Sequence, residues 1–121
     1  MHGKVVVITG ATSGIGRIAA EALAAQGARI VLVARDEARA KSVVARLGEV
    51  APQVEHRAHI GDLLSLADTK RVGDRIAAEE SRIDALINNA GACDSYGIGC
   101  PPICDPRLCR SRIRKGVCRK E

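Results

Sequence analysis

Aromatic side chains are almost absent from this sequence of 121 residues. Tyr96 is the only one, and Phe and Trp are missing, so any core has to be aliphatic. Apolar residues make up 46% of the chain, which is enough for one small core, and two full domains are excluded by the length. The apolar run after Lys4 is too short for a secretory signal or a membrane span. We therefore expect a small cytoplasmic protein with no membrane partner.

Cysteine is absent from the first 92 residues, and the balance of charge changes at the same point. Residues 1–92 carry 12 basic and 11 acidic side chains, a net charge of +1, whereas residues 93–121 carry 7 and 3, a net charge of +4. The sequence therefore divides into a nearly neutral part, 1–92, and a Cys/Arg-rich tail, 93–121. All five cysteines lie in the tail: Cys93, Cys100, Cys104, Cys109 and Cys118.

The first 92 residues alternate between short aliphatic runs and helix-like segments. Their order predicts a parallel α/β sheet with helices on both faces. Polar alternation in residues 53–60 marks an outer strand. We predict strands within 4–10, 28–34, 53–60 and 83–91, and helices within the segments 15–27, 36–48 and 63–81, the first two of which end on a glycine.

Two features of the predicted helices come from the position of apolar residues and glycines. Gly27 and Gly48 are expected to lie just beyond the ends of the first two helices. The apolar face of the first helix is predicted to contain Ile15, Ile18, Ala19, Ala22 and Leu23.

The segment TGATSGIG, residues 9–16, lies between the first strand and the first helix. Gly10 allows a sharp turn, Gly14 allows the backbone to approach a phosphate, and Gly16 allows the helix to pack closely on the strand. Free N–H groups and the positive end of the helix dipole would then face an anion. The expected ligand is a pyrophosphate.

TGATSGIG together with NNAG at residues 88–91 resembles the short-chain dehydrogenase/reductase family. The resemblance covers roughly residues 3–92, about the first half of a Rossmann sheet. It implies a doubly wound parallel sheet with strand order 3-2-1-4, here incomplete, with about four strands and three helices and an irregular C-terminal tail. It also implies a nicotinamide dinucleotide as the cofactor.

The resemblance assigns roles to particular positions. The diphosphate would be lined by Gly10, Ser13, Gly14, Ile15 and Gly16, with Thr9 bracing the turn. The adenine would lie against Asp62 and Leu63, and the adenosine ribose against Asn88, Asn89, Ala90 and Gly91, which also hold the central strands together. Without the resemblance, Asp62 would be interpreted as a solvated loop acid or a helix N-cap.

Arg35 follows the second strand, at the position whose side chain distinguishes NAD from NADP in Rossmann folds. An acid at this point bonds the ribose 2′-hydroxyl of NAD, whereas an arginine meets the 2′-phosphate of NADP. A guanidinium suits a phosphate, and Asp36 is expected to begin the next helix. NADP is therefore favoured over NAD, against the alternative that Arg35 is only a solvated loop charge.

Hydride transfer in the resembled family uses a tyrosine with a lysine four positions later. Here the residue four positions after Tyr96 is Cys100 and not a lysine, so we identify no catalytic residue and expect this chain alone to be inactive. The alternative is a non-catalytic nucleotide-binding or interaction module. The fourth strand would lack a neighbour on one side, which predicts self-association through an open sheet edge.

The tail, residues 93–121, fits no regular period and contains three prolines. Its cysteines lack CxxC pairs and nearby histidines, so we predict no metal site. Its arginines have no aromatic platform beside them, which argues against nucleic acid as a partner. One hypothesis, testable by sequencing the gene, is that a frame change or truncation near codon 92 produced a disordered or out-of-frame tail.

Overall fold

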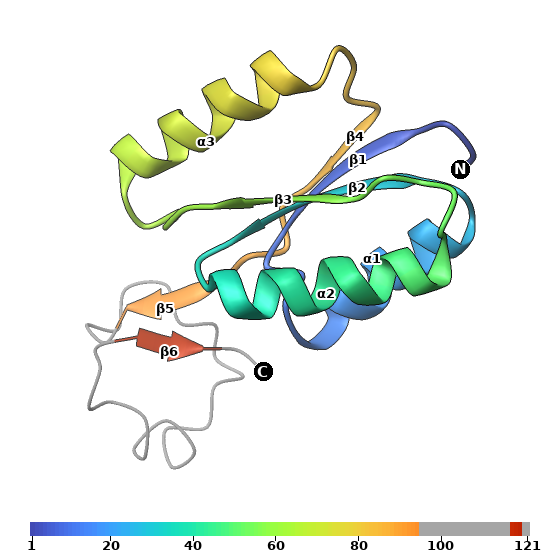
Figure 1. The fold of residues 1–121 in the computed structure, drawn as a ribbon. Helices are drawn as coiled ribbons and strands as arrows, with labels where there is room; N and C mark the ends of the chain where they lie inside the picture. The colour runs from blue at the N-terminus through green and yellow to red at the C-terminus, as the bar shows by residue number, and fades with distance from the viewer. Residues whose placement is uncertain (95–116, 120–121) are drawn as a thin grey trace. The chain divides into compact units, whose positions relative to one another are not determined.

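The computed structural model describes residues 1–94 and 117–119, which fall into two compact units, Met1–Asn89 and Ala90–Glu121. Strands and helices alternate along the first unit, as the sequence predicts (Figure 1). The elements are β1 (Val5–Thr9), α1 (Gly14–Ala25), β2 (Arg29–Ala34), α2 (Glu37–Val50), β3 (Arg57–Ile60), α3 (Leu66–Glu79) and β4 (Ala85–Ile87).

The four strands form one parallel sheet in the order β3-β2-β1-β4. Val7 of β1 pairs with Val31 of β2 on one side and with Leu86 of β4 on the other. The chain builds outward from β1 to β3 and then returns to place β4 on the opposite side, which is the doubly wound, Rossmann-type arrangement. Both the predicted strand order and the outer position of β3 are confirmed.

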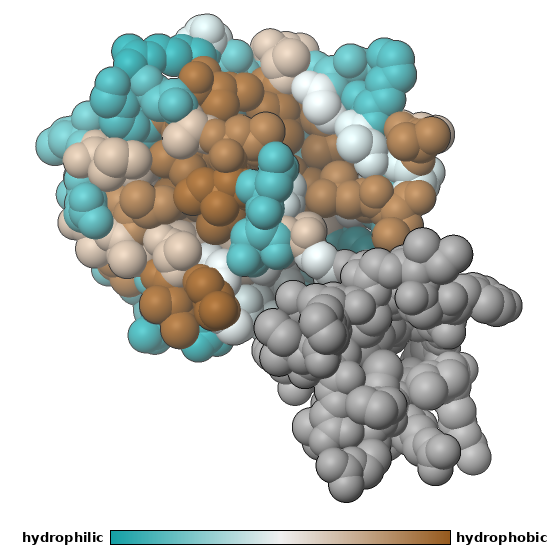
Figure 2. Space-filling view, turned by 180° about the vertical axis from the view of Figure 1, so that it is seen from behind, coloured by the Kyte–Doolittle hydropathy of each residue, from teal (hydrophilic) through white to brown (hydrophobic). Residues whose placement is uncertain are grey.

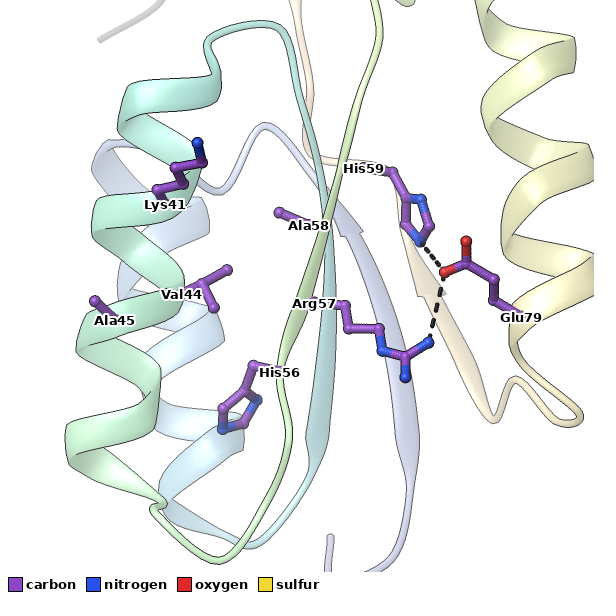
Figure 3. Close-up of a pocket in the computed structure, with 8 residues that line it drawn as sticks. All are labelled: Lys41, Val44, Ala45, His56, Arg57, Ala58, His59 and Glu79. Carbon is purple, nitrogen blue, oxygen red and sulfur yellow. Dashed lines mark ion pairs between the residues drawn. The ribbon is translucent and has the colours of Figure 1, made fainter.

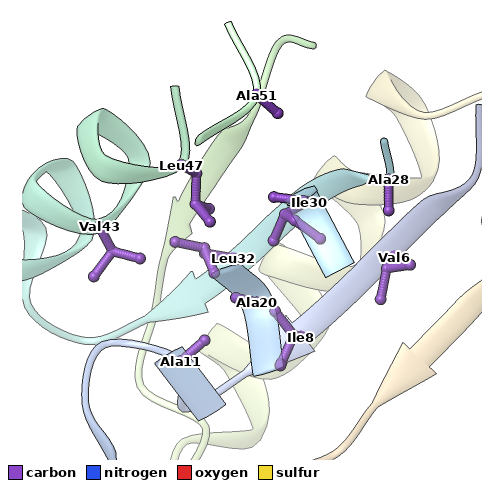
Figure 4. Packing of buried hydrophobic residues seen from close by; sticks show 11 residues of the cluster. Val6, Ile8, Ala11, Ala20, Ala28, Ile30, Leu32, Val43, Leu47 and Ala51 are labelled. Atoms are coloured by element: carbon purple, nitrogen blue, oxygen red, sulfur yellow. The ribbon is translucent and has the colours of Figure 1, made fainter. Parts of the chain in front are cut away.

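Helices cover both faces of the sheet, α1 and α2 on one face and α3 on the other (Figure 1). Alternate residues of β1 point to opposite faces, so Val6 and Ile8 join the α1/α2 side while Val7 joins the α3 side. The larger cluster is built from alanine, valine, leucine and isoleucine alone (Figure 4). Small alanines on the helices let the backbones approach the sheet without aromatic filling.

The predicted buried face of α1 is partly wrong. Ala19 and Leu23 pack against the core as predicted, but Ile15, Ile18 and Ala22 are exposed, and the helix residues buried most deeply are Gly16, Ala20 and Ala24. The cause lies at the start of the helix, where Gly16 packs against the turn after β1 and so fixes which side of the helix faces the sheet.

The predicted end of α2 at Gly48 is also wrong, because the helix continues to Val50. A Cβ at Gly48 would meet nothing within 4 Å, so no close contact there interrupts the helix. Pro52 disfavours helical geometry in the residue before it, and α2 ends with Ala51 as its C-cap. Gly27, by contrast, has φ +84° directly after the C-cap of α1, as predicted.

The described part of the second unit contains two short strands, β5 (Ala92–Asp94) and β6 (Val117–Arg119), which pair antiparallel. The sequence predicts no strand in this tail, because three-residue segments carry too little pattern to detect. Tyr96 and the predictions about Cys100, Cys104 and Cys109 lie outside the described residues. Over the described ranges no cluster of metal-ligating side chains occurs, and no helix has the length and apolarity to cross a bilayer.

Candidate functional site

The carboxyl ends of the parallel strands meet at one edge of the sheet, and the order of the strands reverses between β1 and β4. In doubly wound folds, ligands bind at this edge, beside the point of reversal. The turn 10–13 follows β1, Arg35 follows β2, and Asn88 follows β4. The fold therefore brings to one edge three segments that lie far apart in the sequence.

The turn after β1 depends on two glycines with positive φ. Gly10 has φ +67° and donates its N–H to the Val33 carbonyl oxygen at 3.3 Å, which ties the turn to β2. Gly14 has φ +58°, and a Cβ built there would meet nothing within 4 Å. The backbone at Gly14 is thus open on the side where a ligand would approach.

Gly16 fulfils a different requirement, the close approach of α1 to the turn. A Cβ at this position would collide with Nδ2 of Asn89 and would lie 2.6 Å from the Gly10 carbonyl oxygen. Only glycine fits between helix, turn and the end of β4. Gly10 and Gly16 therefore make the sharp turn and the close packing that the motif predicts, whereas the approach of a phosphate to Gly14 stays a prediction.

The N-terminus of α1 is left open to an anion. Its N-cap, Ser13, makes no side-chain hydrogen bond to the helix, and the first turn holds no acidic residue. In α2 and α3, by contrast, Asp36 and Ser65 accept hydrogen bonds from the Arg39 and Asp68 N–H groups. The first-turn N–H groups and the positive dipole end of α1 can therefore meet a diphosphate. Ile15 lies exposed in the same turn.

Asn89 connects the end of β4 to the turn after β1. Its backbone N–H donates to Thr9 Oγ1 at 3.1 Å, and its Nδ2 donates to the Gly10 carbonyl oxygen at 3.1 Å. The Thr9 hydroxyl in turn donates to the Ile87 carbonyl oxygen at 3.5 Å. These contacts fix the glycine turn against β4. Asn88 is exposed at the end of the same strand.

Ala90 and Gly91, the last two residues of the NNAG motif, begin the second compact unit. Both are exposed. Their expected place beside the ribose stays a prediction.

Arg35 is exposed directly after β2 and makes no ion pair with any residue of the described part of the chain. Its neighbour Asp36 is the N-cap of α2 and accepts a hydrogen bond from the Arg39 N–H at 3.1 Å. One oxygen of the Asp36 carboxylate therefore caps α2, and the exposed Arg35 guanidinium has no ion-pair partner in the described part of the chain.

Asp62 lies in a tight turn after β3 and is not a helix cap. Its Oδ1 accepts a hydrogen bond from the Leu64 N–H at 3.0 Å, and the N-cap of α3 is Ser65. Leu63 is half-buried and packs against the α3 side of the core. The Asp62 backbone N–H donates to Asp68 Oδ2 at 3.0 Å.

Asp68 and Arg71 support this loop and were not predicted from the sequence. The hydrogen bond from the Asp62 N–H, followed by that from Arg71, lowers the pKa of the Asp68 carboxyl below its usual value. Arg71 also donates to the Ile60 carbonyl oxygen at 3.1 Å. Ser65-x-x-Asp68 has the spacing of a capping box and signals the N-cap, but it does not predict the bond between the Asp62 N–H and Asp68.

A hollow of about 440 Å³ lies elsewhere, along the outer strand β3 (Figure 3). His56 and Ala58 point to its α2 side, whereas Arg57 and His59 point to Glu79 of α3 (Figure 3). Glu79 lies 3.5 Å from the Arg57 guanidinium and 3.6 Å from His59 Nε2. The hollow shares no residue with the glycine turn and is separate from the candidate site.

Comparison with known proteins agrees with this geometry. The family model for short chain dehydrogenase matches residues 4–100. A Streptomyces sp. (strain C5) protein named "Putative daunorubicin C-13 ketoreductase DnrU" is 47% identical over 94 residues, which cover 75% of this chain and 31% of that protein. The chain belongs to the short-chain dehydrogenase family.

Solved structures show the same relationship. A short chain dehydrogenase from Shigella flexneri superimposes with a TM-score of 0.70 at 30% identity, covering 75% of this chain and 36% of the other. The Pseudomonas aeruginosa RhlG/NADP active-site complex gives a TM-score of 0.69 at 32% identity, covering 75% and 36%. The chain thus spans about a third of the length of the relatives it matches.

Proposed function

We propose that this chain binds NADP at the carboxyl edge of its sheet, as the cofactor-binding half of an oxidoreductase that reduces carbonyls or oxidises alcohols. The glycine turn and the open N-terminus of α1 would hold the diphosphate. The half-buried loop at Asp62 and Leu63 would hold the adenine, and the segment 88–91 the ribose. When bound, the nicotinamide supplies or accepts the hydride.

The observation that carries the choice of NADP is the pair Arg35 and Asp36. One oxygen of the Asp36 carboxylate accepts a helix N–H and the other lies 3.7 Å from Nε of Arg39, so both oxygens are engaged within α2, which makes Asp36 a poorer partner for a ribose 2′-hydroxyl. The Arg35 guanidinium has no competing carboxylate and suits a 2′-phosphate. The related RhlG protein was solved with NADP, which supports the same choice.

We propose further that this chain binds the cofactor without turnover, because its one tyrosine is not followed by a lysine four positions later. A non-catalytic nucleotide-binding or interaction module is the second candidate, and saturable cofactor binding without turnover by a soluble, monodisperse chain would favour it. We also propose self-association through the edge of β4 that pairs with no other strand of the described residues. A cytoplasmic location and the absence of a nucleic-acid partner remain expectations from the sequence.

The test is a fluorescence titration of the full chain with NADPH and with NADH. We expect saturable binding that prefers NADPH, and Arg35→Ala should reduce the preference roughly tenfold or more, since a hydrogen bond to a charged group contributes about 1.5–3 kcal/mol. Arg39→Ala is the matched control, an exposed arginine four residues away that lies in α2. An unchanged preference in Arg35→Ala would show that Arg35 does not read the 2′-phosphate.

A further inference from the structure

Exposed apolar side chains lie at several places on the surface of the molecule, as Figure 2 shows for one face. Single residues of this kind are ordinary on a folded protein and indicate no particular ligand. The loop 61–65, which joins β3 to α3 (Figure 1), is more specific, because polar side chains of α3 hold its backbone at several points. It is also the loop in which we propose that the adenine binds.

The Asp68 carboxylate is directed to this loop and not to its own helix. In a capping box, the acid at this position accepts the N–H of the N-cap residue. Here the Ser65 N–H donates instead to the Asp62 carbonyl oxygen at 3.0 Å. Asp68 Oδ2 accepts the N–H of Asp62 at 3.0 Å, six positions earlier in the chain. The acid thus fixes the backbone of the loop residue that we assign to the adenine.

Arg71 connects Asp68 to the end of β3. Its Nη2 donates to Asp68 Oδ1 at 3.3 Å and to the Ile60 carbonyl oxygen at 3.1 Å. Ile60 pairs with Ala34 of β2, so these contacts tie the loop to the sheet. The guanidinium also compensates the Asp68 carboxylate, so the loop contains no uncompensated second acid beside Asp62.

Two further contacts of α3 hold the same loop. The Thr69 hydroxyl donates to the Ser65 carbonyl oxygen at 2.9 Å and lies 3.4 Å from the Leu63 carbonyl oxygen. A Cβ at Gly61 would lie 2.5 Å from Val72 Cγ2, which leaves no room for a side chain between loop and helix. The loop is therefore formed before a ligand arrives, which lowers the entropic cost of binding.

The Asp62 carboxylate keeps one oxygen for a ligand. Its Oδ1 accepts the Leu64 N–H at 3.0 Å, and Oδ2 has no hydrogen-bond partner among the residues that the structure describes. An ionised carboxylate only accepts hydrogen bonds. The 6-amino group of adenine is a donor, whereas a 6-oxo group is an acceptor. A fixed Asp62 would thus distinguish a 6-amino purine from a 6-oxo purine.

We infer that Asp68, together with Arg71, is a positioning residue for the adenine end of the cofactor. It holds the Asp62 backbone so that the free oxygen of the Asp62 carboxylate accepts the 6-amino group. Asp68 acts through Asp62 and does not touch the cofactor itself. The inference rests on the proposed function, and it predicts that loss of Asp68 weakens the choice of base and leaves the choice of the 2′-phosphate by Arg35 unchanged.

The test is a fluorescence titration of the full chain with NADPH and with its hypoxanthine analogue, which carries a 6-oxo group in place of the 6-amino group. Wild type should bind NADPH at least about tenfold more tightly, because the analogue cannot donate to the Asp62 carboxylate. Asp68→Ala should lower this ratio to about threefold or less, with an unchanged ratio between NADPH and NADH. Asp68→Asn retains one acceptor oxygen, and its ratio should lie between those of Asp68→Ala and wild type.

Asp74→Ala is the matched control. Asp74 is an exposed acid of the same helix that pairs with Lys70 at 2.6 Å and makes no contact with the loop. Its removal should leave the base ratio as in wild type. Without cofactor, amide hydrogen exchange over 61–64 should become at least about tenfold faster in Asp68→Ala and stay unchanged in Asp74→Ala. Far-UV circular dichroism establishes that the variants are folded.

Several results would overturn the inference while the proposed function stands. They are a wild type that binds NADPH and the analogue equally, an Asp68→Ala variant with the wild-type ratio, and an Asp68→Ala variant that loses affinity for both ligands by the same factor, as a purely structural role predicts. If Asp68→Ala does not fold, a wild-type ratio in Asp68→Asn has the same meaning. A folded wild type that binds no dinucleotide would refute the proposed function, and the role of Asp68 with it.

Discussion

Replacing Gly16 with alanine tests the close approach of α1, the glycine turn and β4. The added methyl group would collide with Nδ2 of Asn89 and lie 2.6 Å from the Gly10 carbonyl oxygen. Asn89 would have to move, which breaks its 3.1 Å hydrogen bond to that oxygen. The backbone of Gly10 cannot move away easily, because its N–H is bonded to Val33 of β2.

The expected change in the free energy of unfolding of Gly16→Ala is the sum of three contributions. Overpacking costs about 1–3 kcal/mol, and the lost hydrogen bond costs about 1 kcal/mol. Alanine in place of glycine within a helix returns about 1 kcal/mol. We therefore expect Gly16→Ala to lower the free energy of unfolding by about 1–3 kcal/mol, measured by urea denaturation followed by circular dichroism.

Gly73→Ala is the matched control, since Gly73 lies within α3 and a Cβ there would meet nothing within 4 Å. The same substitution should then stabilise the chain by about 0.5–1 kcal/mol. We therefore expect the free energy of unfolding to fall in Gly16→Ala and to rise in Gly73→Ala. A Gly16→Ala variant as stable as wild type would show that helix, turn and strand are not packed as closely as described.

Two further predictions concern buried polar groups. Burial is the main cause that lowers the pKa of His56 below 6.5, and its Nδ1 accepts the Ile30 N–H at 3.1 Å. The contribution of neutral His56 to the free energy of unfolding should therefore be fully present above about pH 6.5 and be lost as the pH drops toward the folded-state pKa. Urea titrations at about pH 7.5 to 5 should show a smaller loss of stability in His56→Gln than in wild type or in the exposed control His2→Gln. Glu80→Gln removes the buried partner that lies 3.0 Å from Arg29 and should cost about 1–3 kcal/mol in the same assay at neutral pH, whereas Glu79→Gln, which is more exposed, should cost less than about 1 kcal/mol. Equal losses in the two glutamate variants would show that burial of the Arg29–Glu80 pair contributes nothing.

The order of strands and helices could be predicted because each β-branched run and each following helix carries its own local pattern. The motifs at 9–16 and 88–91 predicted where the candidate site lies in the fold, since they stand at the ends of two strands that the sheet sets side by side. Local signals also sufficed at Asp36, whose position before an amphipathic segment indicates an N-cap, and the structure confirms it.

Periodicity predicted the packing of Ala19 and Leu23 but not the exposure of Ile15 and Ile18, because the tight contact at Gly16 determines how the helix sits on the sheet. Without tertiary contacts, Ile15 and Ile18 look like core residues, although both are exposed. Residues such as Arg71 act through a contact eleven positions away, to the Ile60 carbonyl oxygen, which no local pattern specifies.

Isothermal titration of the full chain with NADPH, followed by NADH, tests the central claim most directly. The geometry of the glycine turn, the open start of α1 and the available Arg35 predict saturable binding of one NADPH per chain, and weaker binding of NADH. A folded chain that binds neither dinucleotide, or that binds NADH more tightly, would contradict the assignment of this edge of the sheet as an NADP site.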